Sequence, residues 1–286
     1  MKIILYFLQY IFIKLFFLIC KIIGFKKASN FGKFVGEKIG PIFKSKAIIK
    51  KNINLILPNT SQENIDIITK KMWGNYGRIL AEYPFLKKFK NNSFEQYIEI
   101  EGKEYLEEIK KDNRRVVFVS GHFNNFELMA MQLENSGLNI AAIYRPLNNV
   151  FLNRIMEKIR LNDICKKQIK KGKSGTRELL QLFKDGYSIA LMIDQRVSEG
   201  IKSKLFKRSA LTTTIPAQLV KKYGVDVVPI YIERKKKVYF KMYVNKPINF
   251  KKNVSLEEVT ETLNQELEKM ILKKPDQWIW SHDRWK

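Results

Sequence analysis

His122 is the residue of this chain that is best placed to move a proton. It is one of only two histidines, and it directly follows the segment 116–121, VVFVSG, whose apolar run predicts a buried strand with a tight turn at Gly121. Catalytic groups in an open α/β sheet gather where such strands end. A neutral imidazole at that position can accept a proton near neutral pH.

Glu127 stands five residues after His122, at the predicted start of the next helix. This spacing lets the carboxylate turn toward the imidazole, and we expect it to accept a hydrogen bond from Nδ1 and leave Nε2 free. Such a base activates a hydroxyl of the substrate. No Gly-x-Ser-x-Gly segment occurs, so Ser120 and Cys165 are not favoured as nucleophiles. A structural histidine that caps the strand end is the competing interpretation.

The segments around His122 resemble one enzyme family. The His-x4-Glu pattern is similar to the catalytic motif of glycerolipid acyltransferases, and 121–127, GHFNNFE, resembles that of the late acyltransferases of lipid A biosynthesis, the lauroyl and myristoyl transferase family. The resemblance continues, in order, through Tyr144-Arg145-Pro146, Asp194-Gln195-Arg196, Gly200-Ile201, Thr212-Thr213-Thr214, Val228-Pro229 and the aromatic and basic segment 275–285.

The resemblance implies transfer of a fatty acyl chain from acyl carrier protein to a hydroxyl of a Kdo-bearing, phosphorylated lipid A precursor in lipopolysaccharide biosynthesis. It implies no metal and no further cofactor. His122 would deprotonate the hydroxyl and Glu127 would orient His122. Arg145 would stabilise the oxyanion, a contribution of about 3 to 4 kcal/mol for one donor, with a salt-bridge role as its alternative. Another glycolipid or phospholipid acceptor, or a non-enzymatic basic membrane-binding protein, remains the alternative function.

Other polar residues are candidates for substrate binding. Asp194, Gln195 and Arg196 follow a predicted strand, where they either serve the site or cap a loop. Some relatives carry a second acidic residue where Gln195 or Arg196 stands, so no catalytic acid is assigned there. Arg177 is a candidate ligand for acceptor phosphate, with an exposed helix position as its alternative. His282, among C-terminal tryptophans, is expected to serve packing or a membrane boundary.

The N-terminal segment is apolar over about 20 residues, long enough to cross a bilayer as a helix. Lys26 and Lys27 follow it without a small-residue cleavage site, which predicts an uncleaved anchor with the remaining chain in the cytoplasm. Its polar and tyrosine side chains share one helical face, the pattern of a helix lying in the membrane surface. They are Lys2, Tyr6, Gln9, Tyr10, Lys14 and Lys21. Spanning and in-plane anchoring both remain open.

The charge predicts an anionic partner. The 286 residues include 53 Lys and Arg against 28 Asp and Glu, a formal net charge of +25. With the anchor, this favours an anionic membrane, a phosphorylated lipid and acyl carrier protein over nucleic acid. The lysine-rich run 166–173 could bind phosphate or the carrier, although a solvated loop is the favoured interpretation. Two cysteines provide no disulfide framework and no zinc-ligand spacing. Together with the anchor, the family resemblance implies a bacterial inner-membrane protein whose catalytic part faces the cytoplasm.

The hydrophobic pattern predicts a membrane anchor over 1–25 and one α/β domain over 26–286, with an N-terminal helical region at 26–90. Strands are expected at 97–101, 115–120, 140–144, 188–193, 225–233 and 237–244. Helices are expected at 31–42, 46–57, 64–83, 104–111, 125–136, 150–162, 176–184, 213–223 and 255–272. This alternation predicts a mostly parallel mixed sheet flanked by helices, which ends in an antiparallel hairpin near residue 235.

Overall fold

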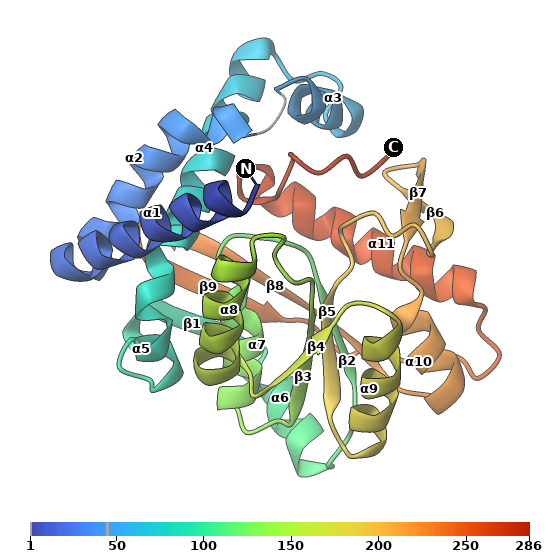
Figure 1. Ribbon diagram of the computed structural model, residues 1–286. Coiled ribbons are helices and arrows are strands. Elements are labelled where there is room, and N and C mark those ends of the chain that lie inside the picture. Colours follow the sequence, from blue (N-terminus) through green and yellow to red (C-terminus); the bar gives the residue numbers. More distant parts are fainter. Residues whose placement is uncertain (1, 44–45) are drawn as a thin grey trace.

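The computed structural model describes residues 2–43 and 46–286, so Met1 of the expected anchor lies outside the described residues. The chain forms a mixed sheet covered by helices on both faces, with four N-terminal helices gathered at one end (Figure 1). The strand order of the sheet is β1-β9-β8-β2-β5-β3-β4. The predicted fold class is therefore confirmed.

All strands of this sheet except β4 lie close to the predicted segments. They are β1 (Ile98–Glu101), β2 (Val117–Ser120), β3 (Ile140–Tyr144), β4 (Lys167–Lys170), β5 (Ser188–Met192), β8 (Val227–Lys236) and β9 (Tyr239–Val244). Strand β2 is parallel to both β5 and β8, and β3 is parallel to both β5 and β4. The expected antiparallel hairpin is β8 and β9. Because β2 lies between β5 and β8, the residues that follow it emerge beside the end of β5 and alongside β8.

Two features of the sheet structure were not predicted. Residues 166–173 are not one continuous loop, because β4 occupies Lys167–Lys170 at the sheet edge and α9 begins at Lys173. Only Ile169 of β4 is buried, so the strand lacks the apolar pattern that would reveal it. A separate antiparallel hairpin, β6 (Ile201–Leu205) and β7 (Arg208–Thr212), was also missed.

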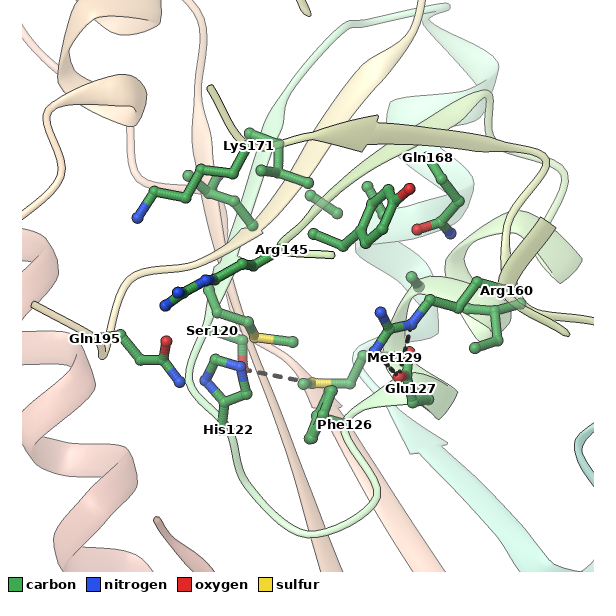
Figure 2. Close-up of a pocket in the computed structure, with 18 of the residues that line it drawn as sticks. Ser120, His122, Phe126, Glu127, Met129, Arg145, Arg160, Gln168, Lys171 and Gln195 are labelled. Carbon is green, nitrogen blue, oxygen red and sulfur yellow. Dashed lines mark hydrogen bonds and ion pairs between the residues drawn. The ribbon is translucent and has the colours of Figure 1, made fainter. Parts of the chain in front are cut away.

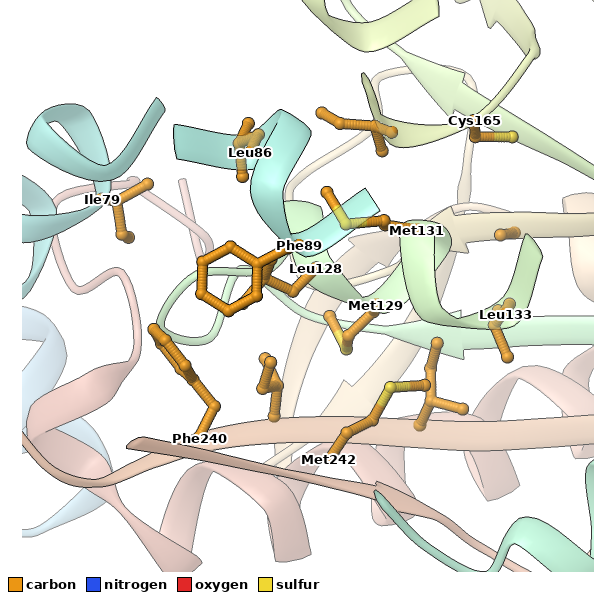
Figure 3. Close-up of a cluster of buried hydrophobic side chains, with 14 of the residues drawn as sticks. Ile79, Leu86, Phe89, Leu128, Met129, Met131, Leu133, Cys165, Phe240 and Met242 are labelled. Carbon is orange, nitrogen blue, oxygen red and sulfur yellow. The ribbon is translucent and has the colours of Figure 1, made fainter. Parts of the chain in front are cut away.

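Helices cover the two faces of the sheet. They are α6 (Lys103–Lys111), α7 (Glu127–Asn135), α8 (Val150–Ile159), α9 (Lys173–Lys184), α10 (Ile215–Tyr223) and α11 (Leu256–Lys273). Alternate residues of β2 enter different cores, as expected for a pleated strand buried on both sides. Phe118 packs with residues of α6 and α7, whereas Val117 and Val119 pack with residues of α9, α10 and α11. Figure 3 shows part of the core to which Phe118 belongs, where Leu128 and Met131 of α7 lie near Phe89.

The N-terminal helices are α1 (Lys2–Ile23), α2 (Phe25–Phe43), α3 (Lys46–Ile56) and α4 (Gln62–Glu82), followed by the short helices η1 (Tyr83–Phe85) and α5 (Leu86–Lys90). Glycines allow α2 and α4 to pack backbone against backbone. A Cβ atom at Gly36 would lie 2.2 Å from the carbonyl oxygen of Trp73, far too close for any side chain. This close packing holds the C-terminal end of α4, with Glu82, inside the domain.

Candidate active site

His122 leaves β2 through a turn that requires glycine. A Cβ atom at Gly121 would lie 2.8 Å from the ring of Phe123 and 3.2 Å from Cβ of Asp194, so a side chain here would displace both neighbours. The turn brings the His122 side chain, 22% exposed, to the lining of a cavity at the C-terminal edge of the sheet. The predicted position of the histidine is confirmed.

Asp194 is the carboxylate that contacts the imidazole. Its Oδ1 lies 2.8 Å from Nδ1 of His122, and its Oδ2 accepts hydrogen bonds from the backbone N–H of His122 at 2.8 Å and from Nε1 of Trp278 at 2.9 Å. The carboxylate is 1% exposed. An ionised carboxylate only accepts hydrogen bonds, so Nδ1 carries the proton and Nε2 is the nitrogen available as a base.

Each member of this pair changes the pKa of the other. Burial lowers the pKa of His122, but the charge of Asp194 and its hydrogen bond outweigh burial, so the pKa lies above its ordinary value of 6.5. Burial raises the pKa of Asp194, yet the charge of His122 and the bonds from His122 and Trp278 hold it below its ordinary value of 3.8. The pair therefore favours an imidazolium beside a carboxylate, which is the state that a proton transfer to Nε2 produces.

The expected contact between Glu127 and Nδ1 of His122 is wrong. Glu127 begins α7 and accepts hydrogen bonds from Tyr83 and from Arg160, whose Nη2 lies 2.6 Å and Nε 3.0 Å from Oε1. The loop between His122 and Glu127 passes through Asn124 with φ of 44°, in the left-handed region. The carboxylate is thereby directed toward α8, while Asp194 takes the position beside the imidazole. Glu127 still lines the same cavity, where Figure 2 shows Phe126 and Met129 between it and His122.

The loop that carries His122 is held by buried polar residues that the sequence analysis missed. Asn125 donates a hydrogen bond to Glu82, 2.9 Å from Oε2, and Arg234 donates to both oxygens of Glu82 at 2.8 and 2.9 Å. Asn124 Nδ2 donates to Oε1 of Gln277 at 2.7 Å. Asn124 and Asn125 belong to the motif around His122, but no short-range pattern identifies partners 43 to 153 positions away.

The cavity beside His122 has a volume of about 480 Å³. Its floor is formed by one side of the sheet, where Phe118 of β2, Ala190 of β5 and Ala142 of β3 are register partners across three strands. Met129 of α7 also lines it. Small and apolar side chains therefore form the inner part of the cavity, which suits a hydrocarbon chain.

Basic and amide side chains line the outer part of the cavity. Arg145 follows β3 and is exposed, and Figure 2 shows it on the same side of the cavity as His122 and Gln195. Lys171, from the lysine-rich run, also lines the cavity. Of the candidate site residues, His122, Glu127, Arg145 and Gln195 line this cavity. Arg160 was missed, because its position follows only from the way α8 continues into a short π-helix.

Several sequence candidates lie outside the cavity lining. Arg177 is exposed on α9, and Arg196 donates its backbone N–H to Nε2 of His282 at 2.9 Å. Trp278 and Trp280 are buried, so the C-terminal segment serves packing rather than a membrane boundary. Burial raises the pKa of Cys165 to about 11, which opposes thiolate chemistry. Within residues 2–43 and 46–286, no group of three or more His, Cys, Asp and Glu side chains could hold a metal ion.

Comparison with known proteins identifies the family. A family model of bacterial lipid A biosynthesis acyltransferases matches residues 1–286. The chain is 24% identical over 266 residues to the lipid A biosynthesis palmitoleoyltransferase of Escherichia coli (strain K12), covering 88% of this chain and 84% of the relative. It is 21% identical over 255 residues to the myristoyltransferase of the same organism (88% and 77% covered), and 24% identical over 247 residues to its lauroyltransferase (84% and 78% covered).

The family model spans the whole chain, and the relatives' matches include the part that carries His122, Asp194 and the cavity. The resemblance of the motifs to this family is therefore confirmed. Acyl transfer in lipid A biosynthesis is the activity that this membership supports. The chain belongs to the bacterial lipid A biosynthesis acyltransferase family.

Proposed function

We propose that the protein transfers a fatty acyl chain from the thioester of acyl carrier protein to a hydroxyl of a Kdo-bearing, phosphorylated lipid A precursor. The reaction takes place at the cytoplasmic face of the bacterial inner membrane and uses no metal or further cofactor. The observation that carries the proposal is His122, held by the buried carboxylate of Asp194 at 2.8 Å, at the edge of an apolar cavity.

His122 acts as a general base in this reaction. Nε2 takes the proton of the acceptor hydroxyl while the hydroxyl oxygen attacks the thioester carbonyl, which gives a tetrahedral oxyanion. Asp194 stabilises the imidazolium that forms and keeps Nε2 directed at the substrate. When the oxyanion collapses, the carbon–sulfur bond breaks and the leaving thiolate takes the proton from Nε2. An ester and the free thiol of the carrier are the products.

Arg145 is the proposed donor to the oxyanion, and with Lys171 it can also bind a phosphate of the acceptor. Both side chains line the cavity that His122 lines. Glu127 has a different role from the one expected from the motif. It accepts hydrogen bonds from Tyr83 and from Arg160, which lines the cavity. It raises the pKa of His122 only through its charge, without contacting the imidazole. We assign it a positioning role.

The basic composition supports acyl carrier protein as donor. A net charge of +25 attracts an acidic protein and an anionic lipid surface over the Debye length of about 8 Å at physiological salt. Transfer to another glycolipid or phospholipid remains the second candidate, because His122 and Asp194 do not recognise the acceptor themselves.

The test is an assay of the purified full chain with labelled acyl carrier protein, with and without the lipid A precursor or a phospholipid. We expect product only with the precursor, and its mass identifies both the chain and the hydroxyl. His122→Ala should abolish the product while vesicle binding stays intact. Free fatty acid in equal amounts with and without acceptor would indicate a hydrolase, and undiminished transfer by His122→Ala would refute the role of the base.

A further inference from the structure

Helix α1 is the one helix of the described residues that is long and apolar enough to cross a membrane. Its N-terminal half is nevertheless attached to the domain. Asn149, which caps α8, donates hydrogen bonds from Nδ2 to the carbonyl oxygen of Tyr6 at 2.9 Å and to Oε1 of Gln9 at 3.0 Å. The ring of Phe151 meets that of Phe7 edge-on, with 5.6 Å between centroids.

The C-terminal half of α1 is attached as well. Phe16 stacks on Phe31 of α2 at 5.8 Å, Phe17 stacks on Tyr83 at 6.4 Å, and Cys20 is fully buried. Contacts therefore extend from residue 6 to residue 20, which is about 21 Å of helix at 1.5 Å per residue. That length is most of the roughly 30 Å thickness of a bilayer's hydrocarbon core.

The opposite face of α1 is apolar and uncovered. Ile4, Leu8, Phe12, Leu15 and Ile22 share this face and are between 55% and 75% exposed. An apolar stripe along a whole helix marks an interaction surface. Tyr6, Gln9 and Tyr10, which the sequence placed on the opposite face, are among the residues that contact the domain.

A spanning orientation conflicts with these contacts. If α1 crossed the bilayer as it is docked here, α8 would have to enter the hydrocarbon beside it. Arg154 and Lys158 of α8 are exposed, and charged side chains in hydrocarbon are strongly unfavourable. An orientation in the plane of the membrane surface buries the apolar stripe and leaves α8 in water. Lys14 and Lys21, at the flank of the stripe, can then meet anionic headgroups.

The entrance of the cavity lies next to this helix. Leu147 and Val150, on either side of Asn149, are 41% and 55% exposed, and Leu147 and Asn148 line the cavity. We propose that α1 lies in the plane of an anionic bilayer surface and, with Leu147 and Val150, forms a membrane-contact surface beside the cavity entrance. An acceptor lipid then reaches His122 while its own acyl chains stay in the bilayer. The orientation itself does not depend on which reaction the cavity supports.

Sidedness in sealed vesicles tests the orientation. Lys2→Cys at the start of α1 and Lys221→Cys on the exposed side of α10 are made in the full chain, whose native Cys20 and Cys165 are both buried. We expect a membrane-impermeant maleimide to label both variants from the same side of the membrane. Labelling of Lys2→Cys only from the opposite side, or only after lysis, would show that α1 spans the bilayer and would overturn the proposal.

Depth measurements provide a second, independent readout. Single tryptophans at Leu8, Leu15 and Ile22 are compared for quenching by lipids brominated at different chain depths, with the parent chain as background. An in-plane helix gives the same shallow quenching profile at all three positions. A profile deepest at Leu15 would indicate a spanning helix, and no quenching at any position would indicate that protein, such as a second copy of the chain, covers the stripe.

Discussion

Replacing Asp194 by Asn tests the assignment of the catalytic pair. Two donors converge on Oδ2 of Asp194, the backbone N–H of His122 and Nε1 of Trp278. The carbonyl oxygen of an asparagine would therefore occupy this position, and its NH2 group would face Nδ1. Nδ1 must then accept a hydrogen bond, so the proton of the neutral imidazole moves to Nε2. The variant keeps the shape of the site but holds its histidine in the wrong tautomer.

The size of the effect follows from two losses. A hydrogen bond to a charged group contributes about 1.5 to 3 kcal/mol, or roughly 10- to 150-fold in rate, to stabilising the imidazolium. The tautomer change adds to this, and in the Ser-His-Asp triad of serine proteases the same substitution lowers kcat about 10⁴-fold. We therefore expect kcat to fall by between roughly 10² and 10⁴.

The pH dependence gives a signature that a merely structural effect lacks. The charge of Asp194 raises the pKa of His122, so its loss should shift the acidic limb of the residual rate to lower pH. Stability changes in a defined window. The raised pKa of His122 stabilises the fold below about pH 6.5, and this stabilisation is lost as pH rises through the folded pKa. The lowered pKa of Asp194 stabilises the fold above about pH 3.8, and this stabilisation is lost as pH falls through the folded pKa. The substitution should therefore destabilise more near pH 5.5 than near pH 9.

The assay is transfer from labelled acyl carrier protein, measured across pH, with thermal unfolding in the same buffers. Asp276→Asn is the matched control, because it removes the same charge from a partly exposed carboxylate that pairs with Lys71 at 3.6 Å and does not contact His122. The control should stay within about twofold, as a surface substitution does. If Asp194→Asn kept half of the wild-type kcat, or left the acidic limb unmoved, His122 would not depend on Asp194.

Four other outcomes follow from the site and the charge. Glu127→Gln should lower the melting temperature, yet move the acidic limb less than Asp194→Asn does, because Glu127 does not contact the imidazole; an equal shift would restore Glu127 as the partner. Arg145→Ala should lower kcat about 10²- to 10³-fold in steady-state kinetics, the effect of removing one oxyanion donor. Arg177→Ala, on the exposed side of α9, should stay near wild type in the same assay. Equal losses would contradict the placement of Arg145 in the cavity and of Arg177 outside it. Glu82→Ala should lower the free energy of unfolding in urea by about 3 to 5 kcal/mol, because it leaves the buried guanidinium beside it unpaired; a loss below about 1 kcal/mol would contradict this. Raising salt from 0.1 M to 1 M, which shortens the Debye length from about 10 to about 3 Å, should weaken carrier and vesicle binding in co-sedimentation, and unchanged binding would leave the basic surface without this role.

Local patterns predicted most of the elements correctly. The apolar run before His122 is β2, and the alternation after residue 97 is the mixed sheet. Elements without a strong apolar pattern escaped detection. Strand β4 has one buried residue and three lysine or glutamine neighbours, so its pairing with β3, and not its own composition, makes it a strand.

Sequence by itself determined that a histidine would stand at the end of a buried strand, beside a glycine turn, and that the first helix would have one apolar and one polar face. These are short-range properties, because strand and helix periodicities act over a few residues. Only the tertiary structure decided which carboxylate meets the histidine. Strands β2 and β5 are parallel neighbours, with Ser120 opposite Met192. Asp194 therefore emerges beside His122 from 72 positions away, while Glu127, close in sequence, is directed toward Arg160 by the loop between them.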